Sequence, residues 1–559
     1  MLDPSLDVAH KNTTRYSVTK RHKNTKIPSP QERRTLPLHS SLVKPIRTEQ
    51  LVEELLDDKT KQRWHAVWHE TFGPILDPSS DVPTSPLLDQ EQLDQLARDD
   101  IIESVSADML RADPTKDGGF AYTVIEDRYN DEGDIVQRQR MIYWPRRRND
   151  VLLQRYKPET HLFRISKYHA AIHEQAAITG DIKCGFYGIV IPTWARAWFR
   201  IVDRFGNVWQ MTRLPMGIRT AVELMEIVTL AMIGHPAVCK PQHVVNNVVK
   251  HGFVDDFRVA GSVSDLMHAA QIIYNRCEVF DITLKAPLTI QTRYIFLGLL
   301  WNHEQRTVAI GTKTLRKIPT TIPHTMTFGD FQQLVSRLIY CAGALRCPLA
   351  PFYFALKWAC RRCNDLNNGR YAPTDYLDMP DGVQHELDVW QAEIRGQHAF
   401  GPTSFAQRRH ATLFTDASLY GWGAIIITAD HKVFIAGSKW SRPFTSGDIS
   451  RLEAAAVRNA TRAFANVILE HGSVDFRIDN TSVTSAVRRG IARAPALNVA
   501  LAGILKWLSR YDIVVTASYV KSDENLADPV SRGHPTPSLS REIVANVYER
   551  RGAGGILGA

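Results

Sequence analysis

The chain has 559 residues, of which 44% are hydrophobic and 23% charged, and its formal net charge is +9. This length exceeds what one hydrophobic core supports, so we expect three or four globular domains. The sequence has no apolar run long enough to cross a bilayer and begins with a polar segment, which argues against a membrane or secreted protein. Together with seven scattered cysteines, an odd number, this favours an intracellular protein of the cytoplasm or nucleus.

Positive charge is concentrated at the N-terminus. Residues 1–47 contain ten Lys or Arg against three Asp or Glu, so about +7 of the net charge lies there. This Ser/Thr/Pro-rich, aromatic-poor stretch cannot build a core, and we expect residues 1–48 to form a basic disordered tail. Nonspecific attraction to phosphate backbones is one plausible use, and a solubilising or localising role is another.

The next part of the chain reads as helices followed by strands. Apolar spacing predicts a helical N-terminal region over 49–120. A hairpin is expected from strands 122–125 and 136–143 around the polar turn 130–133. Later elements are expected as strands at 188–191, 198–201 and 208–212, and as a helix from the loop 214–218 to about residue 233.

Asp255 and Asp256 stand in an otherwise apolar, strand-like run. Burying unpaired carboxylates there costs more free energy than the burial of the apolar strand residues contributes. A tight hairpin that presents both acids to one or more Mg²⁺ ions makes chemical sense, whereas the alternative for the pair alone is an ordinary β-turn. Asp181 precedes Asp255 by 74 residues, enough for two or three strands and one helix, so the two acids could lie on neighbouring strands of one antiparallel sheet.

Four motifs in this order resemble the palm of retroelement reverse transcriptases. They are Asp-Ile-Lys-Cys-Gly-Phe-Tyr at 181–187, Leu-Pro-Met-Gly-Ile at 214–218, Phe-Val-Asp-Asp at 253–256 and Phe-Leu-Gly at 296–298. The resemblance implies that Asp181 and Asp255 bind two Mg²⁺ or Mn²⁺ ions, with Asp256 as a nearby catalytic acid.

The same resemblance implies a nucleotide- and primer-binding set. Its members are Arg140 toward the triphosphate, Phe186 as a gate against the ribose 2′-OH, Met216 and Gly217 in the second motif, and Phe296, Leu297 and Gly298 at the primer end. Met216 stands where the family usually has Phe, an apolar replacement that leaves the metal ligands intact.

Residues 311–400 read as helices with basic flanks, including 331–345 and 351–362, and the resemblance implies a thumb and connection there. The polar, Pro-containing stretch 364–410 looks like a linker region, with 401–410 as the linker itself. Cys360 and Cys363 have zinc-like spacing but no second pair, and we interpret them as structural.

From residue 411 the pattern changes to short strands and helices. Strands are expected at 411–417, 421–428, 432–437, 473–478 and 513–520, and a helix at 450–470. Asp416 ends the first strand, Glu453 opens the helix, Asp479 ends the fourth strand and Asp528 lies on a terminal helix. Each acid alone reads as a surface helix cap, but in one mixed sheet the four converge, where they repel unless cations lie between them.

Residues 411–535 resemble ribonuclease H. Thr-Asp-Ala-Ser with Gly-Trp-Gly-Ala, and Glu-Asn-Leu-Ala-Asp-Pro-Val-Ser-Arg-Gly, look most like the versions in DIRS-type (tyrosine-recombinase) retrotransposons and hepadnaviruses. The resemblance implies a retroelement of the DIRS-type or the LTR retrotransposon class. The resemblance implies that Asp416, Glu453, Asp479 and Asp528 bind a second pair of Mg²⁺ or Mn²⁺ ions. Tyr519 stands where many relatives have a His that assists product release or proton shuttling.

The expected fold class is therefore α+β multidomain. A right-hand polymerase (fingers and palm 121–310, thumb and connection 311–400) precedes a ribonuclease H-like α/β domain at 411–535 and a tail at 536–559. The expected function is an RNA-directed DNA polymerase with ribonuclease H activity, with RNA template, DNA primer, RNA–DNA hybrid and deoxynucleotide triphosphates as partners and no membrane. A captured, non-catalytic nucleic-acid-binding remnant is the alternative, and the sequence leaves oligomeric state, template, primer and host open.

Overall fold

The computed structural model describes residues 35–38, 41–74, 84–85, 88–112, 118–129, 135–160, 165–396, 401, 409–442 and 444–534. Several predictions fall outside these residues: most of the basic tail, the turn 130–133, most of the linker 401–410 and the tail 536–559. Contacts divide the chain into two units, an N-terminal unit of His22–Phe163 with Glu174–Tyr294, and a C-terminal unit of Met1–Arg21, Arg164–His173 and Ile295–Ala559.

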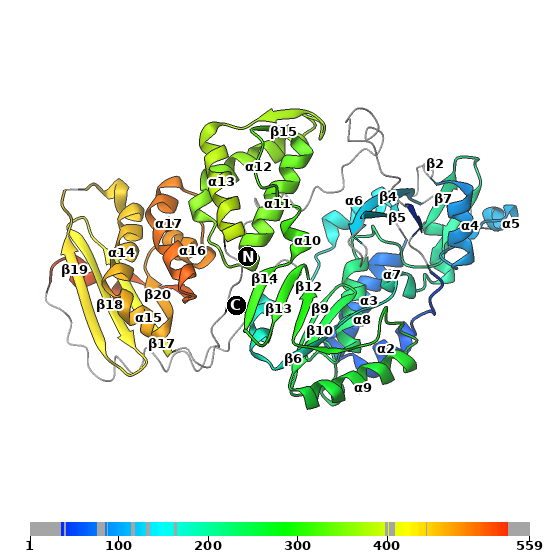
Figure 1. Cartoon of the computed structure of the whole chain (residues 1–559), viewed down its shortest axis with the longest axis horizontal. Helices are drawn as coiled ribbons and strands as arrows, with labels where there is room; N and C mark the ends of the chain where they lie inside the picture. The colour runs from blue at the N-terminus through cyan, green and yellow to red at the C-terminus, as the bar shows by residue number, and fades with distance from the viewer. Residues whose placement is uncertain are drawn as a thin grey trace. The chain divides into compact units, whose positions relative to one another are not determined.

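The N-terminal unit contains three sheets and the helices around them (Figure 1). Its sheets have the strand orders β1-β5-β4, β11-β6-β10-β9 and β2-β7-β8-β3. The strands are β1 (Thr35–Leu38), β2 (Thr84–Ser85), β3 (Ile102–Ser104), β4 (Phe120–Tyr129), β5 (Ile135–Trp144), β6 (Ala176–Asp181), β7 (Arg200–Asp203), β8 (Val208–Met211), β9 (Val249–Phe253), β10 (Asp256–Gly261) and β11 (Ile290–Gln291). The helices are α2 (Thr48–Leu55), α3 (Asp58–Phe72), α4 (Gln90–Arg98), α5 (Ala107–Ala112), α6 (Arg146–Arg155), α7 (Gly185–Gly188), α8 (Ala221–Met232) and α9 (Val263–Val279), with 3₁₀ turns η3 (Thr193–Trp198) and η4 (Pro241–His243).

Helix α8 is the central helix of this unit, and its sequence explains why. Ten of its residues are buried, seven of them apolar, so nearly every face of the helix is covered, as expected of a helix enclosed by others. It packs against α2, α3 and strand β9. Helix α9 is instead amphipathic: the Ser262 side chain caps its first turn and Leu266, Ala269 and Ile273 form the buried stripe. These two helices support the sheet that carries Asp181, Asp255 and Asp256.

Three predictions in this unit are wrong. Residues 185–188 form helix α7 rather than the start of a strand at 188–191, and Val190 makes an isolated bridge to Arg213. The strand expected at 198–201 is β7, at Arg200–Asp203, because η3 continues through Trp198. Residues 41–47, expected in the disordered tail, are packed on the unit, because the apolar side chains of Val43 and Ile46 are only 6% and 5% exposed.

The C-terminal unit begins with a small sheet and a group of helices. These elements are η2 (Ile165–His173), β12 (Arg293–Phe296, whose first residues precede the unit boundary), β13 (Leu299–Asn302), β14 (Thr307–Ile310), α10 (Thr312–Leu315), β15 (Thr325–Thr327), α11 (Phe328–Ala344), η5 (Ala350–Phe352), α12 (Tyr353–Asn367), β16 (Tyr376–Asp378) and α13 (Asp381–Gly396). Helix α13 occupies much of the region 364–410 that was expected to be a linker. Its buried Val383, Leu387, Trp390 and Ile394 are spaced for one helix face, which explains the helix.

A five-stranded mixed sheet forms the end of this unit, in the order β19-β18-β17-β20-β21. Its elements are β17 (Arg409–Ala417), β18 (Gly421–Thr428), β19 (Val433–Lys439), η7 (Ser446–Asp448), α14 (Ile449–Ala463), α15 (Ala465–His471), β20 (Gly472–Ile478), α16 (Thr481–Arg489), α17 (Pro495–Arg510), β21 (Val514–Tyr519), η8 (Ser522–Glu524) and α18 (Asp528–Ser531). The single helix expected at 450–470 is thus two helices, α14 and α15, that meet at Phe464.

The strands alternate their side chains between two covered faces. Leu413, Ile426 and Phe476 face the apolar core that α14, α16 and α17 cover, whereas Phe414 and Ile425 face Ala527, next to the short helix α18. Strand β17 pairs antiparallel with β18 and parallel with β20, as expected of the mixed sheet. The predicted α+β class, with several sheets and a terminal α/β domain, is confirmed. Among the described residues, no helix is both long and apolar enough to cross a membrane.

Candidate metal centres

The first acidic cluster begins at the hairpin between β9 and β10. Phe253 and Asp256 pair across the hairpin, so Val254 and Asp255 form a two-residue turn. Val254 has φ +59°, a conformation that β-branched residues rarely adopt. Such a strained conformation persists only where the surrounding contacts enforce it. The hydroxyl of Thr229 on α8 donates to the Val254 carbonyl at 2.6 Å. The tip that carries Asp255 is therefore fastened to the central helix.

Antiparallel pairing of β6 with β10 brings Asp181 to this hairpin. Asp181 lies directly opposite Asp256, and the Ile182 amide donates to the Asp255 carbonyl at 3.0 Å. The prediction that the strand of Asp181 and the hairpin of Asp255 are neighbours in one antiparallel sheet is confirmed. Three carboxylates thus gather at one end of this sheet.

Their electrostatics are those of crowded, partly desolvated carboxylates. Burial, with the charges of Asp181 and Asp255, raises the pKa of Asp256 to about 7. Burial and the Asp181 charge also raise the pKa of Asp255, while the positive charges of Arg140 and Lys285 oppose that rise. Hard oxygen donors that repel one another in this way form a suitable set for Mg²⁺ or Mn²⁺.

Lys285 is a residue that the sequence analysis missed. Its ammonium lies 2.8 Å from Asp181 Oδ2, and its amide donates to the Asp181 carbonyl at 2.9 Å. The segment around Lys285 also accepts a hydrogen bond from Lys183 through the carbonyl of Thr283. An isolated lysine 104 residues from its acidic partner leaves no signal in the sequence.

Helix α7, which carries Phe186, packs directly against the acidic hairpin. It follows Cys184, whose φ is +48°, and a Cβ on Gly185 would lie 3.1 Å from the Cβ of Asp255. Only a residue without a side chain fits that approach without displacing a neighbour. Phe186 itself is half-buried against the main core of the unit, one residue along the chain from this contact.

The loop with Met216 and Gly217 is fastened to the strand that carries Arg140. Gly217 has φ +118°, and a Cβ there would lie 2.1 Å from the Tyr143 carbonyl oxygen, so the position requires glycine. The Tyr143 amide donates to the Met216 carbonyl at 3.3 Å, and Asn149 donates to the Gly217 carbonyl at 2.7 Å. These hydrogen bonds therefore hold the loop against the end of strand β5.

Phe296, Leu297 and Gly298 belong to the C-terminal unit, at the turn between β12 and β13. Leu297 and Gly298 have φ values of +51° and +72°, typical of a tight two-residue hairpin turn. The Tyr340 hydroxyl donates to the Leu297 carbonyl, and the Gly311 amide donates to the Gly298 carbonyl at 2.9 Å. The turn is thus rigidly fixed to helix α11 and to the loop after β14.

The second acidic cluster lies on the five-stranded sheet. Asp416 is near the end of β17, Glu453 is on α14, and Asp479 directly follows β20. One oxygen from each carboxylate lies within 4.8 Å of the others. Because β17 and β20 are parallel neighbours, their carboxyl ends bring Asp416 and Asp479 to one edge, and α14 crosses that edge with Glu453.

Each of these three acids has one buried oxygen without a hydrogen-bond partner: Asp416 Oδ2, Glu453 Oε2 and Asp479 Oδ1. The other oxygens are satisfied. The Ala417 amide donates to Glu453 Oε1 at 3.2 Å, and Ser522 donates to Asp479 Oδ2 at 2.9 Å. Buried acceptors without partners are rare, and three from one cluster form a set of oxygens that could bind a cation. The residues fit a divalent metal that prefers oxygen ligands.

The fourth predicted ligand, Asp528, is not among the three acids whose oxygens lie within 4.8 Å of one another, and it borders this centre with two neighbours. The Asp528 carboxylate is engaged by Arg532 at 2.9–3.1 Å, and its charge adds to the rise in the pKa of Asp416. Asn525 donates to Asp416 Oδ1 at 3.3 Å and to the Thr415 carbonyl at 3.0 Å. Tyr519, which the sequence resemblance aligns with a His, is 52% exposed at the end of β21.

The protonation of this cluster gives a prediction for the metal-free protein. Burial and the charges of Asp479 and Asp416 raise the pKa of Glu453 from 4.5 to about 9, and burial raises that of Asp416 from 3.8 to about 6. Between the unfolded and folded pKa values of these two groups, the folded state binds more protons. Their contribution to stability is therefore fully present at low pH and is lost as pH rises, by at most about 1.4 kcal/mol per pH unit and proton.

In EDTA, we therefore expect a lower melting temperature at pH 8 than at pH 6 for the transition that Mg²⁺ shifts. Glu453→Gln should remove most of that pH difference, because the amide does not titrate, and should also weaken the Mg²⁺ stabilisation at pH 8. Differential scanning fluorimetry with and without Mg²⁺ measures both. An equal pH dependence in the wild type and the variant would contradict the assignment of Glu453.

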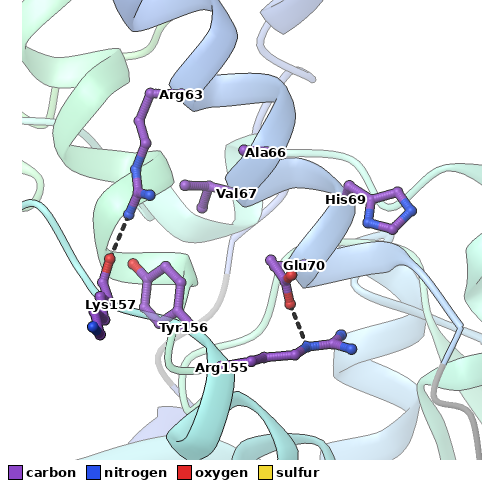
Figure 2. Close-up of a pocket in the computed structure, with 8 residues that line it drawn as sticks. All are labelled: Arg63, Ala66, Val67, His69, Glu70, Arg155, Tyr156 and Lys157. Atoms are coloured by element: carbon purple, nitrogen blue, oxygen red, sulfur yellow. Dashed lines mark hydrogen bonds and ion pairs between the residues drawn. The ribbon is translucent and has the colours of Figure 1, made fainter.

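A pocket of about 320 Å³ in the N-terminal unit is lined by none of the residues of either cluster (Figure 2). Helix α3 and the end of α6 form it, and Figure 2 shows Arg63 directed at Lys157 and Glu70 facing Arg155. Its arginines are neutralised: Arg155 lies 2.6 Å from Glu70, and Arg63 donates to buried Glu223 at 2.6 and 2.9 Å. None of the predicted site residues lines this pocket.

No protein-family profile and no curated protein sequence matches the chain. Among solved structures, it is similar to foamy virus protease–reverse transcriptase in three forms. The dRH form in complex with double-stranded DNA is 12% identical with a TM-score of 0.44, over 89% of this chain and 84% of that chain. The form with an RNA/DNA hybrid is 13% identical with a TM-score of 0.45, over 85% and 62%. The form with double-stranded DNA is 12% identical with a TM-score of 0.43, over 87% and 99%. These TM-scores are all below 0.5, so the similarity assigns no role to either cluster.

Proposed function

We propose that the chain is an RNA-directed DNA polymerase with a ribonuclease H activity, acting on retroelement RNA through two separate pairs of Mg²⁺ or Mn²⁺ ions. The observation that carries the proposal is that one chain contains two carboxylate clusters, each held by a different kind of sheet. One is an antiparallel hairpin with Asp181, Asp255 and Asp256, and the other is a mixed sheet whose Asp416, Glu453 and Asp479 each leave one buried oxygen without a partner.

In the polymerase reaction, the protein positions and stabilises charge rather than supplying a nucleophile. Asp181 and Asp255 would hold the metal pair, which lowers the pKa of the primer 3′-hydroxyl and neutralises charge on the triphosphate. Arg140, whose charge already acts on Asp255, would bind triphosphate oxygens. Lys285 would leave the Asp181 carboxylate when the cations bind there.

In the ribonuclease reaction, Asp416, Glu453 and Asp479 would hold the metal pair that activates water, with Asp528 contributing from α18. The Asn525 and Ser522 side chains orient two of these carboxylates, since each donates a hydrogen bond to one of them. The RNA strand of a hybrid differs from the DNA strand by its 2′-hydroxyl groups, and these define which strand is cut.

Phe186 carries the proposal for sugar selection. Phe186→Val should admit ribonucleotides, because the aromatic ring is the group that would collide with a 2′-hydroxyl. Steady-state incorporation of deoxy- and ribonucleotides would show the deoxy preference falling by about 10²-fold, in line with losing one specific steric contact. Phe205→Val is the matched control, since Phe205 is 64% exposed in the turn between β7 and β8. An unchanged preference in Phe186→Val would place the gate elsewhere.

The function is tested by extension of a DNA primer on an RNA template, with and without Mg²⁺. We expect extension that requires the metal, together with cleavage of the RNA strand in the resulting hybrid. Tight, metal-independent binding of the hybrid without extension or cleavage would instead favour a non-catalytic nucleic-acid-binding remnant.

A further inference from the structure

We infer that residues 41–47 act as a brace that positions the nucleotide-selecting turn α7, so that this N-terminal segment helps to discriminate deoxy- from ribonucleotides. The inference rests on the proposed polymerase function and on Phe186 as the sugar gate. It concerns a segment whose own sequence carries no catalytic motif and which lies in the basic N-terminal stretch.

Helix α7 needs outside support because it is very short. Its four residues make about one turn, and a single turn is not stable by itself in water. On one side it is supported by the acidic hairpin: a Cβ on Gly185 would lie 3.1 Å from the Cβ of Asp255 and 3.0 Å from the sulfur of Met225. This contact fixes the start of the turn relative to the metal ligands.

The brace supplies the contact at the other end of the turn. The Ile46 amide donates to the Gly188 carbonyl at 2.8 Å, and the buried Ile46 side chain packs on the bare Cα of Gly188. A Cβ on Gly188 would lie 2.6 Å from Ile46 Cδ1 and 2.9 Å from its Cγ1. Ser41 adds a contact of 3.6 Å between its hydroxyl and the sulfur of Cys184, which immediately precedes the turn.

The brace is itself anchored to residues 280–281, which directly follow helix α9. The Arg47 amide donates to the Phe280 carbonyl at 3.0 Å, and the Arg47 guanidinium donates to Asp281 at 2.7 Å. The next segment, 282–285, pairs with 181–183 through the Ile182–Leu284 bridge. The brace thus joins the outer end of α7 to the segment that pairs with Asp181, and Phe186 lies between its two fixed ends.

A gate of this kind works only if its ring is held at a fixed distance from the bound sugar, because displacement by about 1 Å is enough to change rates strongly. Ile46→Ala leaves a space beside Gly188, so the turn is free to shift. We expect the ratio of deoxy- to ribonucleotide incorporation efficiency, each measured as kcat/KM, to fall by about tenfold.

The ratio of deoxy- to ribonucleotide incorporation efficiency distinguishes an effect on the position of Phe186 from a loss of folded protein. A variant that only unfolds more easily has less active enzyme, which lowers both efficiencies equally and leaves the ratio unchanged. Leu42→Ala is the matched control, because Leu42 lies in the same brace with a 64% exposed side chain, and its ratio should equal that of the wild type. Ile46→Val, which keeps most of the contact, should stay within about twofold of the wild type.

A complementary pair gives a second measurement. Gly188→Ala should lower the ratio, because its methyl group meets the Ile46 side chain, whereas Gly188→Ala with Ile46→Ala should recover part of the loss, because the smaller side chain makes room.

The full chain is assayed by single-nucleotide incorporation of dCTP and CTP opposite a template guanine on an RNA template. A lowered ratio in Ile46→Ala with recovery in the double variant supports the brace. An unchanged ratio in Ile46→Ala, in an enzyme whose Phe186→Val variant does lose selectivity, overturns the brace and leaves the proposed function standing. A wild type that incorporates neither nucleotide overturns both.

Discussion

Asp255→Asn should lower DNA synthesis by at least about 10³-fold while the protein keeps its fold. The substitution removes a charged metal ligand from the turn between β9 and β10. The fold should survive because the Asp255 carboxylate is disfavoured in the metal-free protein: burial and the Asp181 charge both raise its pKa. A neutral amide of the same shape relieves that repulsion. Single-turnover primer extension measures the loss, and hybrid binding by fluorescence anisotropy tests the fold.

The control for this substitution is Glu278→Gln, which also changes an acid to its amide. Glu278 is exposed on helix α9 in the same unit. Its extension rate should match the wild type. Extension near the wild-type rate in Asp255→Asn would contradict the assignment of Asp255 as a metal ligand.

Asp479→Asn should abolish cleavage of the RNA strand in a hybrid, with an expected loss of at least about 10³-fold, and should leave primer extension nearly unchanged. Asp479 provides one of the three unpartnered buried oxygens, and its charge raises the pKa of both Glu453 and Asp416. The polymerase acids lie in the other unit, and effects at well-separated sites add independently. Cleavage of a labelled hybrid at saturating Mg²⁺ measures the loss.

Asp523→Asn provides the matched control, because Asp523 is exposed in η8, next to the Ser522 that binds Asp479. Cleavage by this control should equal that of the wild type. If Asp479→Asn still cleaved the RNA strand at half the wild-type rate, the second metal centre would have to be built from other residues.

The sequence predicted the acidic clusters because each depends on local patterns. Short strands with acids at their ends located the edges at Asp416 and Asp479, and an Asp-Asp pair inside an apolar, strand-like run predicted the hairpin. The unpartnered oxygens of the second cluster were beyond such patterns, since they depend on which hydrogen bonds the folded chain leaves unmade.

The errors occurred where contacts distant in sequence decide the local structure. The apolar residues from Gly188 onward predicted a strand at 188–191, but Gly188 instead ends helix α7. The backbone of Cys184, just before this helix, has a left-handed conformation, and the helix is enclosed between Asp255 and Ile46. The brace was assigned to the tail because residues 1–47 taken together are basic and aromatic-poor, although Val43 and Ile46 are buried. Lys285 binds Asp181 only through tertiary pairing.

The missed helix α13 is a different case, because its signal was present. Val383, Leu387, Trp390 and Ile394 recur at helical spacing and are buried together. Proline and polar residues elsewhere in 364–410 outweighed this pattern in the prediction of a linker. A periodicity test on the segment by itself would have found the helix.

The central claim is that two separate metal centres perform two reactions on one substrate. One measurement tests it directly: extension and RNA cleavage followed together on a single hybrid with both strands labelled, in Mg²⁺, for the wild type, Asp255→Asn and Asp479→Asn. We expect both activities in the wild type. Asp255→Asn should cleave without extending, with a possible change of cut position, and Asp479→Asn should extend without cleaving. Loss of both activities in either variant, with hybrid binding intact, would contradict it.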